Sequence, residues 1–194
     1  MILEFSESQE TSFSDKLDNM ATNFEIRHEW NVPLKVVLEH LFDDALVGRV
    51  NSALESADRR LVSKDDNGGK VIQRYEVKAH ASDIPAAARK VLSPETLQWT
   101  EESVWDPDNE RFSWTIITKV MPEKIDCSGT VYYESLGSDR TSRIVEGGIS
   151  IKIPIAGRVA EKVIIGKVKE SFEDTGGAEG SYFAEMAQSV AAKS

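Results

Sequence analysis

The sequence has little cysteine and no long apolar run. Cys127 is the only cysteine among the 194 residues, so the chain cannot close a disulfide with itself or build a zinc site from several thiolates. This cysteine usage is typical of a reducing compartment, so we expect a cytoplasmic protein in which Cys127 packs as a small buried hydrophobe. No stretch approaches the roughly eighteen apolar residues of a membrane-spanning helix, and we expect no stable membrane insertion.

Positive charge is also scarce. The chain has 23 Lys and Arg residues against 33 Asp and Glu residues, which gives a formal net charge of -10. Nucleic-acid binding depends on clustered Lys and Arg, so we expect no nucleic-acid partner. His28, His40 and His80 lie on different predicted elements and lack the i, i+4 spacing of a metal-binding pair, so we expect no metal. The sequence has no strong catalytic motif, and we expect no cofactor.

The length of the chain favours one domain with a core of its own. Residues 1–20 are rich in Ser and Glu, and they lack the positive start and the apolar centre of a signal peptide. We therefore expect a poorly ordered leader over residues 1–20, followed by a single domain over residues 21–192.

Alternating apolar residues and clusters of turn-forming residues predict about seven strands. The first strand covers residues 22–30. Three hairpins follow, with arms at 59–64 and 70–79, at 96–105 and 111–121, and at 124–134 and 141–153. The first hairpin has an Asn67-Gly68 centre, which supplies the positive backbone dihedral angles of a tight turn. Gly147 and Gly148 lie inside the last arm, where we expect a bulge or bend.

Helical spacing of apolar residues predicts two helices in the first half of the chain. Asn31 can cap a helix that has Pro33 in its first turn, apolar spacing over residues 36–46, and Gly48 after its end. Residues 84–92 have the spacing of a short second helix.

The end of the chain is its most informative part. An extended apolar run at 148–154 continues directly into helical spacing over 155–172. Gly176 and Gly177 should break or bend this helix before a helical pattern resumes over 178–192. A last strand that runs onto one long helix, after a series of earlier strands, predicts an antiparallel sheet curled around that helix.

This separation of the hairpins from the last helix favours an α+β fold over a parallel doubly wound sheet. The chain resembles the START-related (SRPBCC) superfamily, also called the helix-grip or birch-pollen-allergen-like fold, and within it the bacterial DUF2505 family. The resemblance covers roughly residues 22–188 and includes a strand with the sequence GISIKIP at 148–154 that leads into GRVAEKVI at 157–164. It implies a curved antiparallel sheet of about seven strands wrapped around a long C-terminal helix, with a cavity between them.

Strand alternation directs several polar and aromatic side chains toward this cavity. His28 shares a face with Trp30, Gln73 shares a face with Tyr75, and Glu101 is expected inward by the same logic. The residues expected to line the cavity and bind a ligand are His28, Gln73, Tyr75, Trp99, Glu101, Trp114, Ile164 and Val168. The alternative is that His28 and Glu101 are satisfied polar residues near a sheet edge or under a loop.

Three functions are compatible with the sequence. The first hypothesis is noncatalytic binding or transport of a hydrophobic or lipid-like small molecule, with the segment around Gly176 and Gly177 as a hinge at the entrance. The second is a START-fold enzyme of the cyclase or hydrolase type, in which His28 acts as acid or base with Glu101 or Tyr75. The third is a protein-interaction module with a packed interior.

Overall fold

The computed structural model describes residues 21–54, 57–80, 98–152 and 157–192, and this part of the chain forms one antiparallel sheet and three helices. The strands are β1 (Thr22–Trp30), β2 (Ala57–Asn67), β3 (Lys70–Ala79), β4 (Gln98–Asp106), β5 (Arg111–Thr118), β6 (Ile125–Ser135) and β7 (Thr141–Ile151). The helices are α2 (Leu34–His40), α3 (Asp44–Ala53) and α5 (Gly157–Ala191). The predicted α+β helix-grip fold, with a curved seven-stranded sheet and a long C-terminal helix, is confirmed.

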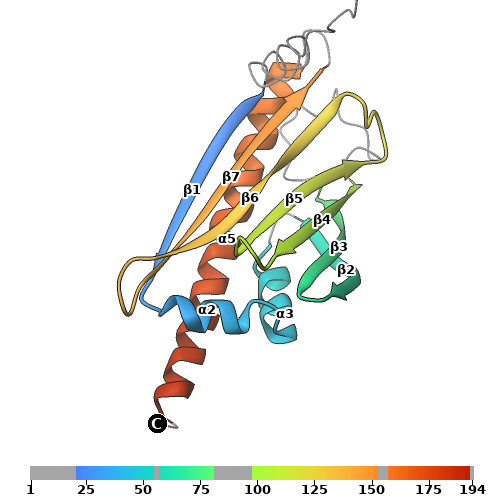
Figure 1. The fold of residues 1–194 in the computed structure, drawn as a ribbon. Helices are drawn as coiled ribbons and strands as arrows, with labels where there is room; N and C mark the ends of the chain where they lie inside the picture. Colours follow the sequence, from blue (N-terminus) through green and yellow to red (C-terminus); the bar gives the residue numbers. More distant parts are fainter. Residues whose placement is uncertain (1–20, 55–56, 81–97, 153–156, 193–194) are drawn as a thin grey trace, which may run out of the picture.

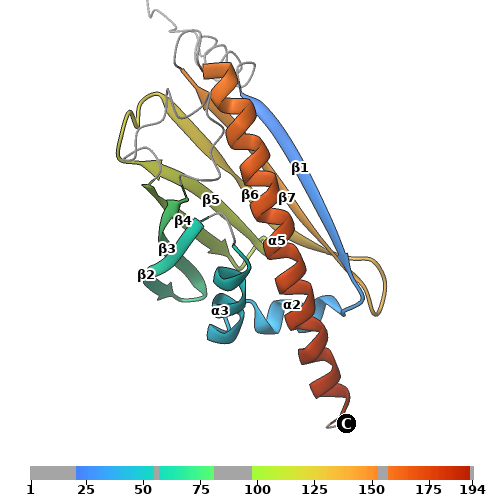
Figure 2. The same cartoon turned by 180° about the vertical axis from the view of Figure 1, so that it is seen from behind.

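The sheet has the order β1-β7-β6-β5-β4-β3-β2, so the first and last of the described strands are neighbours. Figure 1 shows the sheet as a long twisted layer, and Figure 2 shows α5 crossing one face of it. The short helices α2 and α3 lie at one end of the molecule, beside α5. This arrangement leaves the space between the sheet and α5 to be filled by side chains from both.

The three predicted hairpins are confirmed, because β2 pairs with β3, β4 with β5, and β6 with β7. The β2–β3 turn is centred one residue later than the predicted Asn67-Gly68. Gly68 and Gly69 have φ angles of 67° and 93°, while Asn67 pairs with Lys70 as the last pair of the ladder. The two consecutive glycines tolerate these angles at little steric cost.

The predicted single helix over 36–46 is wrong, because the chain forms α2 and α3 with a break between them. Asp43, at the break, has extended backbone angles of φ -66° and ψ 132°. Its carboxylate accepts a hydrogen bond of 2.6 Å from the Tyr182 hydroxyl of α5. The break is therefore accompanied by a contact with a residue 139 positions away. The spacing of apolar residues near Asp43 could not predict this contact.

Two smaller predictions about this region are also wrong. The residue before α2 is Pro33, and no side chain caps the helix, so Asn31 does not have the predicted role. Gly48 lies inside α3 instead of ending a helix. The predicted short helix over 84–92 and the predicted leader over 1–20 lie outside the described residues.

Of the predicted break or bend at Gly176 and Gly177, the break is wrong as well, since α5 runs through both as one helix. Gly176 lies against the ring of His28, and a Cβ atom at this position would be 2.5 Å from the His28 Nε2 atom. Gly180, one turn later, has the same relation to Trp30, with 2.5 Å to the Trp30 Nε1 atom. These glycines let α5 approach β1 closely, and the packing against β1 supports a helix whose own propensity is weak here.

Two apolar clusters hold the sheet and the helices together. One contains Phe24, Ile26, Trp114 and neighbours from the central strands, with Ile165 of α5. The other joins α2, α3 and the last part of α5 to the sheet, and in it the rings of Trp30 and Phe183 have centroids 5.5 Å apart.

Candidate functional site

A cavity of about 330 Å³ lies between the sheet and α5. Its wall is mostly apolar and is built by side chains of β2 to β7, α3 and α5. The volume is at the lower end of the range for small-molecule sites, which is roughly 300 to 1,000 Å³. The apolar part of the wall includes Leu46, Val50, Val77, Phe112, Ile116, Val131, Ile149 and Phe172.

Seven of the eight residues predicted to line a cavity lie on this wall. They are Gln73, Tyr75, Trp99, Glu101, Trp114, Ile164 and Val168. Direct register in the sheet brings the strand residues together, because Tyr75 faces Glu101 and Gln73 faces Ser103 across the β3–β4 pair. That these residues bind a ligand stays a prediction.

His28 is the exception, and it lies outside the cavity wall, between β1 and α5. Its Nε2 atom is 3.0 Å from Glu173 Oε2, and its Nδ1 atom is 3.4 Å from Arg143 Nη1. The close approach of α5 at Gly176 covers the ring. Burial and the charge of Arg143 lower the pKa of His28, although Glu173 acts in the opposite direction.

Glu101 is fully engaged by a cation that sequence reasoning missed. Arg59 of β2 donates to both carboxylate oxygens of Glu101, at 3.2 and 2.7 Å, and to the Asn51 side-chain oxygen at 2.9 Å. The guanidinium carbon lies 3.3 Å from the centroid of the Tyr75 ring. Arg59 faces Val77 in the β2–β3 register, so the alternating pattern of β2 contained the signal that it points inward.

A second buried ion pair on the wall was also missed. Arg143 of β7 and Glu179 of α5 have side chains that are 3% and 13% exposed, and Arg143 Nε lies 2.9 Å from Glu179 Oε2. Burial raises the pKa of Glu179, while the charges of Arg143 and Arg59 lower it. Arg143 of β7 pairs with Tyr133 of β6 on one side and with His28 of β1 on the other. These three neighbouring residues form a polar row across the sheet.

The cavity wall has hydrogen-bonding groups without partners. Among the described residues, five buried side-chain atoms have no hydrogen-bond partner, and all five belong to residues that line the cavity. They are Trp99 Nε1, Trp114 Nε1, Thr118 Oγ1, Arg143 Nε and Glu179 Oε2. Buried polar atoms in folded proteins are nearly always hydrogen-bonded, so this wall is suited to a molecule or to water that carries polar atoms.

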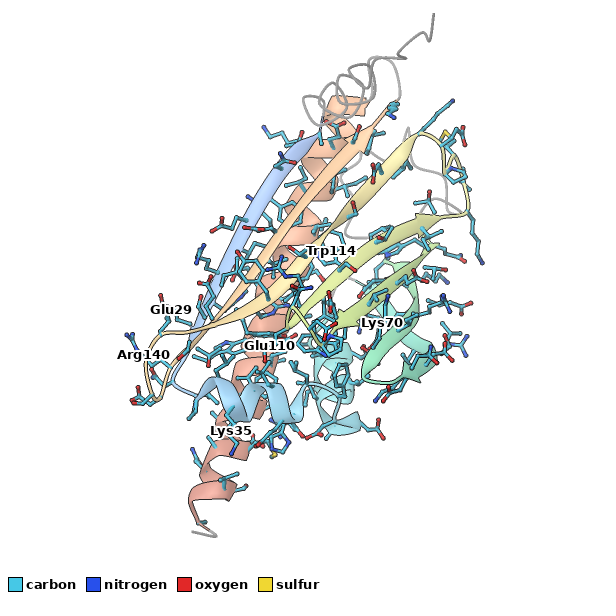
Figure 3. All side chains as sticks on the ribbon, in the orientation of Figure 1. Glu29, Lys35, Lys70, Glu110, Trp114 and Arg140 are labelled. Atoms are coloured by element: carbon cyan, nitrogen blue, oxygen red, sulfur yellow. The ribbon has the colours of Figure 1, made fainter. Side chains whose placement is uncertain are left out.

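Two glycines shape the cavity floor beneath Trp114, which lies near the middle of the sheet (Figure 3). A Cβ atom at Gly147 would be 2.5 Å from Trp114 Cζ2, and one at Gly129 would be 2.6 Å from the same atom. Of the predicted bulge or bend at Gly147 and Gly148, the bulge is wrong, because β7 keeps its register with β1 and β6 there. The glycines instead leave space for the indole ring.

Cys127 is buried on the same wall, as its predicted packing role requires. Burial raises the pKa of its thiol to about 12, so it is a neutral thiol at physiological pH. Within the described ranges, no three His, Cys, Asp or Glu residues gather as metal ligands. None of the helices in the described part of the chain has the length and hydropathy needed to cross a membrane.

Solved structures place this architecture in a known class. An aromatase/cyclase, ZhuI, from Streptomyces sp. R1128 has a TM-score of 0.60 at 13% identity, over 84% of this chain and 94% of that chain. Norcoclaurine synthase from Thalictrum flavum has a TM-score of 0.57 at 12% identity, over 95% and 99%. A START superfamily protein from Mycobacterium smegmatis has a TM-score of 0.50 at 10% identity, over 82% and 98%. The chain has a START-type fold.

The sequence itself identifies the family within that class. Residues 25–178 match the family described as "Protein of unknown function (DUF2505)", and the protein belongs to this family. The predicted resemblance to this family is confirmed, and so is the START-type fold that the resemblance implied. A search of curated proteins found no match.

Proposed function

We propose that the protein binds a mostly apolar small molecule in the cavity between the sheet and α5, as a noncatalytic carrier or sensor. The observation that carries this proposal is an unfilled, mostly apolar cavity, and every unpartnered buried polar atom found in the described residues belongs to a residue that lines it. Removal of apolar ligand surface from water contributes about 25 cal/mol per Å², before the entropic cost of binding, and the few polar groups orient the ligand. A hydrophobic or lipid-like molecule with one or two oxygen atoms suits this wall.

The other two hypotheses have less support. Enzyme relatives of this fold exist, but the proposed acid–base pairing requires His28 beside Glu101 or Tyr75, and the contacts found for His28 are with Glu173 and Arg143. An interaction module was expected to have a packed interior, which does not suit a cavity of about 330 Å³.

Two neighbouring isoleucines of β5 provide a matched test. Ile116 lies on the cavity wall, whereas Ile117 points away from it and is 46% exposed. In a titration with the neutral fluorescent probe N-phenyl-1-naphthylamine, wild type and Ile117→Trp should show saturable binding with similar Kd values. Ile116→Trp fills the cavity and should weaken binding at least about tenfold, which is 1.4 kcal/mol of binding free energy.

Circular dichroism of both variants checks that the fold is retained. Equal binding by the Ile116→Trp and Ile117→Trp variants would place the probe outside the cavity. An absence of saturable binding to wild type would contradict the proposed function itself.

A further inference from the structure

The two buried ion pairs in the cavity differ in how completely their hydrogen bonds are used. In the Arg59–Glu101 pair, both carboxylate oxygens of Glu101 accept well-formed hydrogen bonds, and Arg59 has a third bond to Asn51. Both carboxylate oxygens of Glu101 are therefore already hydrogen-bonded before a ligand binds. The pair links β2 to β4, and Arg59 also links β2 to the end of α3.

The Arg143–Glu179 pair, by comparison, has hydrogen-bonding atoms that are not used. Its Nε and Oε2 atoms are 2.9 Å apart, but their alignment does not form a hydrogen bond, and neither atom has another partner among the described residues. Arg143 Nη1 has two long contacts, at 3.4 Å to the Phe172 carbonyl oxygen and to the His28 ring, and the guanidinium carbon lies 5.5 Å from the centroid of the Phe172 ring. An unused donor and an unused acceptor, both buried, therefore lie side by side on two residues that line the cavity.

We propose that the Arg143–Glu179 pair recognises a hydroxyl group on the ligand. The hydroxyl oxygen accepts a hydrogen bond from Arg143 Nε, and the hydroxyl proton is donated to Glu179 Oε2. This inference rests on the proposed function and deepens it, since it assigns the ligand to the class of neutral alcohols or phenols with an apolar body.

The charges on the wall favour a neutral hydroxyl over a carboxylate. Arg59, Arg143, Glu101 and Glu179 sum to zero, and Lys167, which also lines the cavity, is paired with Glu170 at 2.6 Å. A ligand carboxylate would add an uncompensated buried negative charge and would have no proton to donate to Glu179. A hydrocarbon would leave both polar atoms without partners, which also carries a desolvation cost.

Four naphthalenes that differ at one position test the proposal by isothermal titration calorimetry with the full-length protein at neutral pH. They are naphthalene, 2-naphthol, 2-methoxynaphthalene and 2-naphthoate. We expect 2-naphthol to bind at least about tenfold more tightly than each of the others, because it alone can both accept and donate at this site. The methoxy compound keeps the acceptor oxygen but has lost the proton.

A pair of double variants locates the effect. Arg143→Met with Glu179→Leu replaces the buried ion pair by apolar side chains of similar volume, a change that folded proteins often tolerate. This variant should bind naphthalene at least as tightly as wild type does and should lose the preference for 2-naphthol. The matched control is Arg49→Met with Glu185→Leu, an exposed Arg–Glu pair between α3 and α5, and it should keep the preference.

Each other outcome overturns the inference. Tightest binding of 2-naphthoate would mean an anion site, and equal binding of the uncharged probes would mean that the pair does not read a hydroxyl. If only N-phenyl-1-naphthylamine binds, the hydroxyl inference fails while the proposed function stands. If none of the five probes binds, both fail. If the Arg143→Met, Glu179→Leu variant does not fold, the affinities of wild type for the four naphthalenes decide the proposal alone.

Discussion

His28 illustrates how a single residue can satisfy the pattern for a cavity wall and still not belong to one. It alternates correctly with Ile26 and Trp30, and it is largely buried with a side chain 12% exposed. The helix above it carries Gly176 where the ring would otherwise collide with a side chain. His28 is thus covered by α5 itself and serves the packing of β1 against the helix.

The surroundings of His28 predict its titration. Its pKa should lie below the usual value of 6.5, because burial and Arg143 disfavour the imidazolium. Glu173 raises the pKa, so Glu173→Gln should lower it further, while Glu185→Gln on the exposed part of the same helix should leave it unchanged. NMR titration of the imidazole resonances measures this. A wild-type pKa above 6.5, or an upward shift in Glu173→Gln, would contradict this account of the site.

At the scale of elements, α5 is stabilised by contacts more than by its own sequence. Gly166, Gly176, Gly177 and Gly180 all lie within it, and glycine is the weakest helix former after proline. Only Gly176 and Gly180 of these four make close contacts with other elements, where the rings of His28 and Trp30 occupy the space of a Cβ atom.

Adjacent glycines in α5 should therefore respond oppositely to alanine. Nothing lies within 4 Å of a Cβ at Gly177, so Gly177→Ala should raise the free energy of unfolding by about 0.5–1 kcal/mol through helix propensity. Gly176→Ala should lower it by about 1–3 kcal/mol, because a Cβ there overlaps the His28 ring. Urea denaturation measures both. Stabilisation by both substitutions would show that the contact with β1 is loose.

The strands were predictable because each hairpin is encoded locally. Alternation and turn-forming residues lie next to each other in the sequence, as in the Gly68-Gly69 turn, and they place the side chains of Tyr75 and Glu101 on one face. The helix boundaries were not predictable in the same way. The break at Asp43 and the continuity through Gly176 both depend on contacts with residues more than 100 positions away.

At the scale of the whole molecule, the fold and seven residues of the cavity wall followed from the sequence, but the ion pairs of the wall did not. Arg143 and Glu179 occupy inward positions of β7 and α5, and composition suggests that charged residues belong on the surface. Only the tertiary structure brings the two charges together. In the sequence, each is a single charged residue at an inward position, with no visible partner. The pairing of Arg59 could not be predicted for the same reason, because its partner Glu101 lies 42 positions away.

The central claim is that a small molecule binds between the sheet and α5, and isoleucine methyl NMR tests it most directly. Ile116, Ile149 and Ile164 lie on the cavity wall, whereas Ile72 and Ile117 do not. Titration of isoleucine-methyl-labelled protein with N-phenyl-1-naphthylamine should shift the resonances of the three wall residues and leave those of Ile72 and Ile117 in place. Saturating probe that shifts none of the three wall methyls, or shifts only the outward ones, would contradict the account.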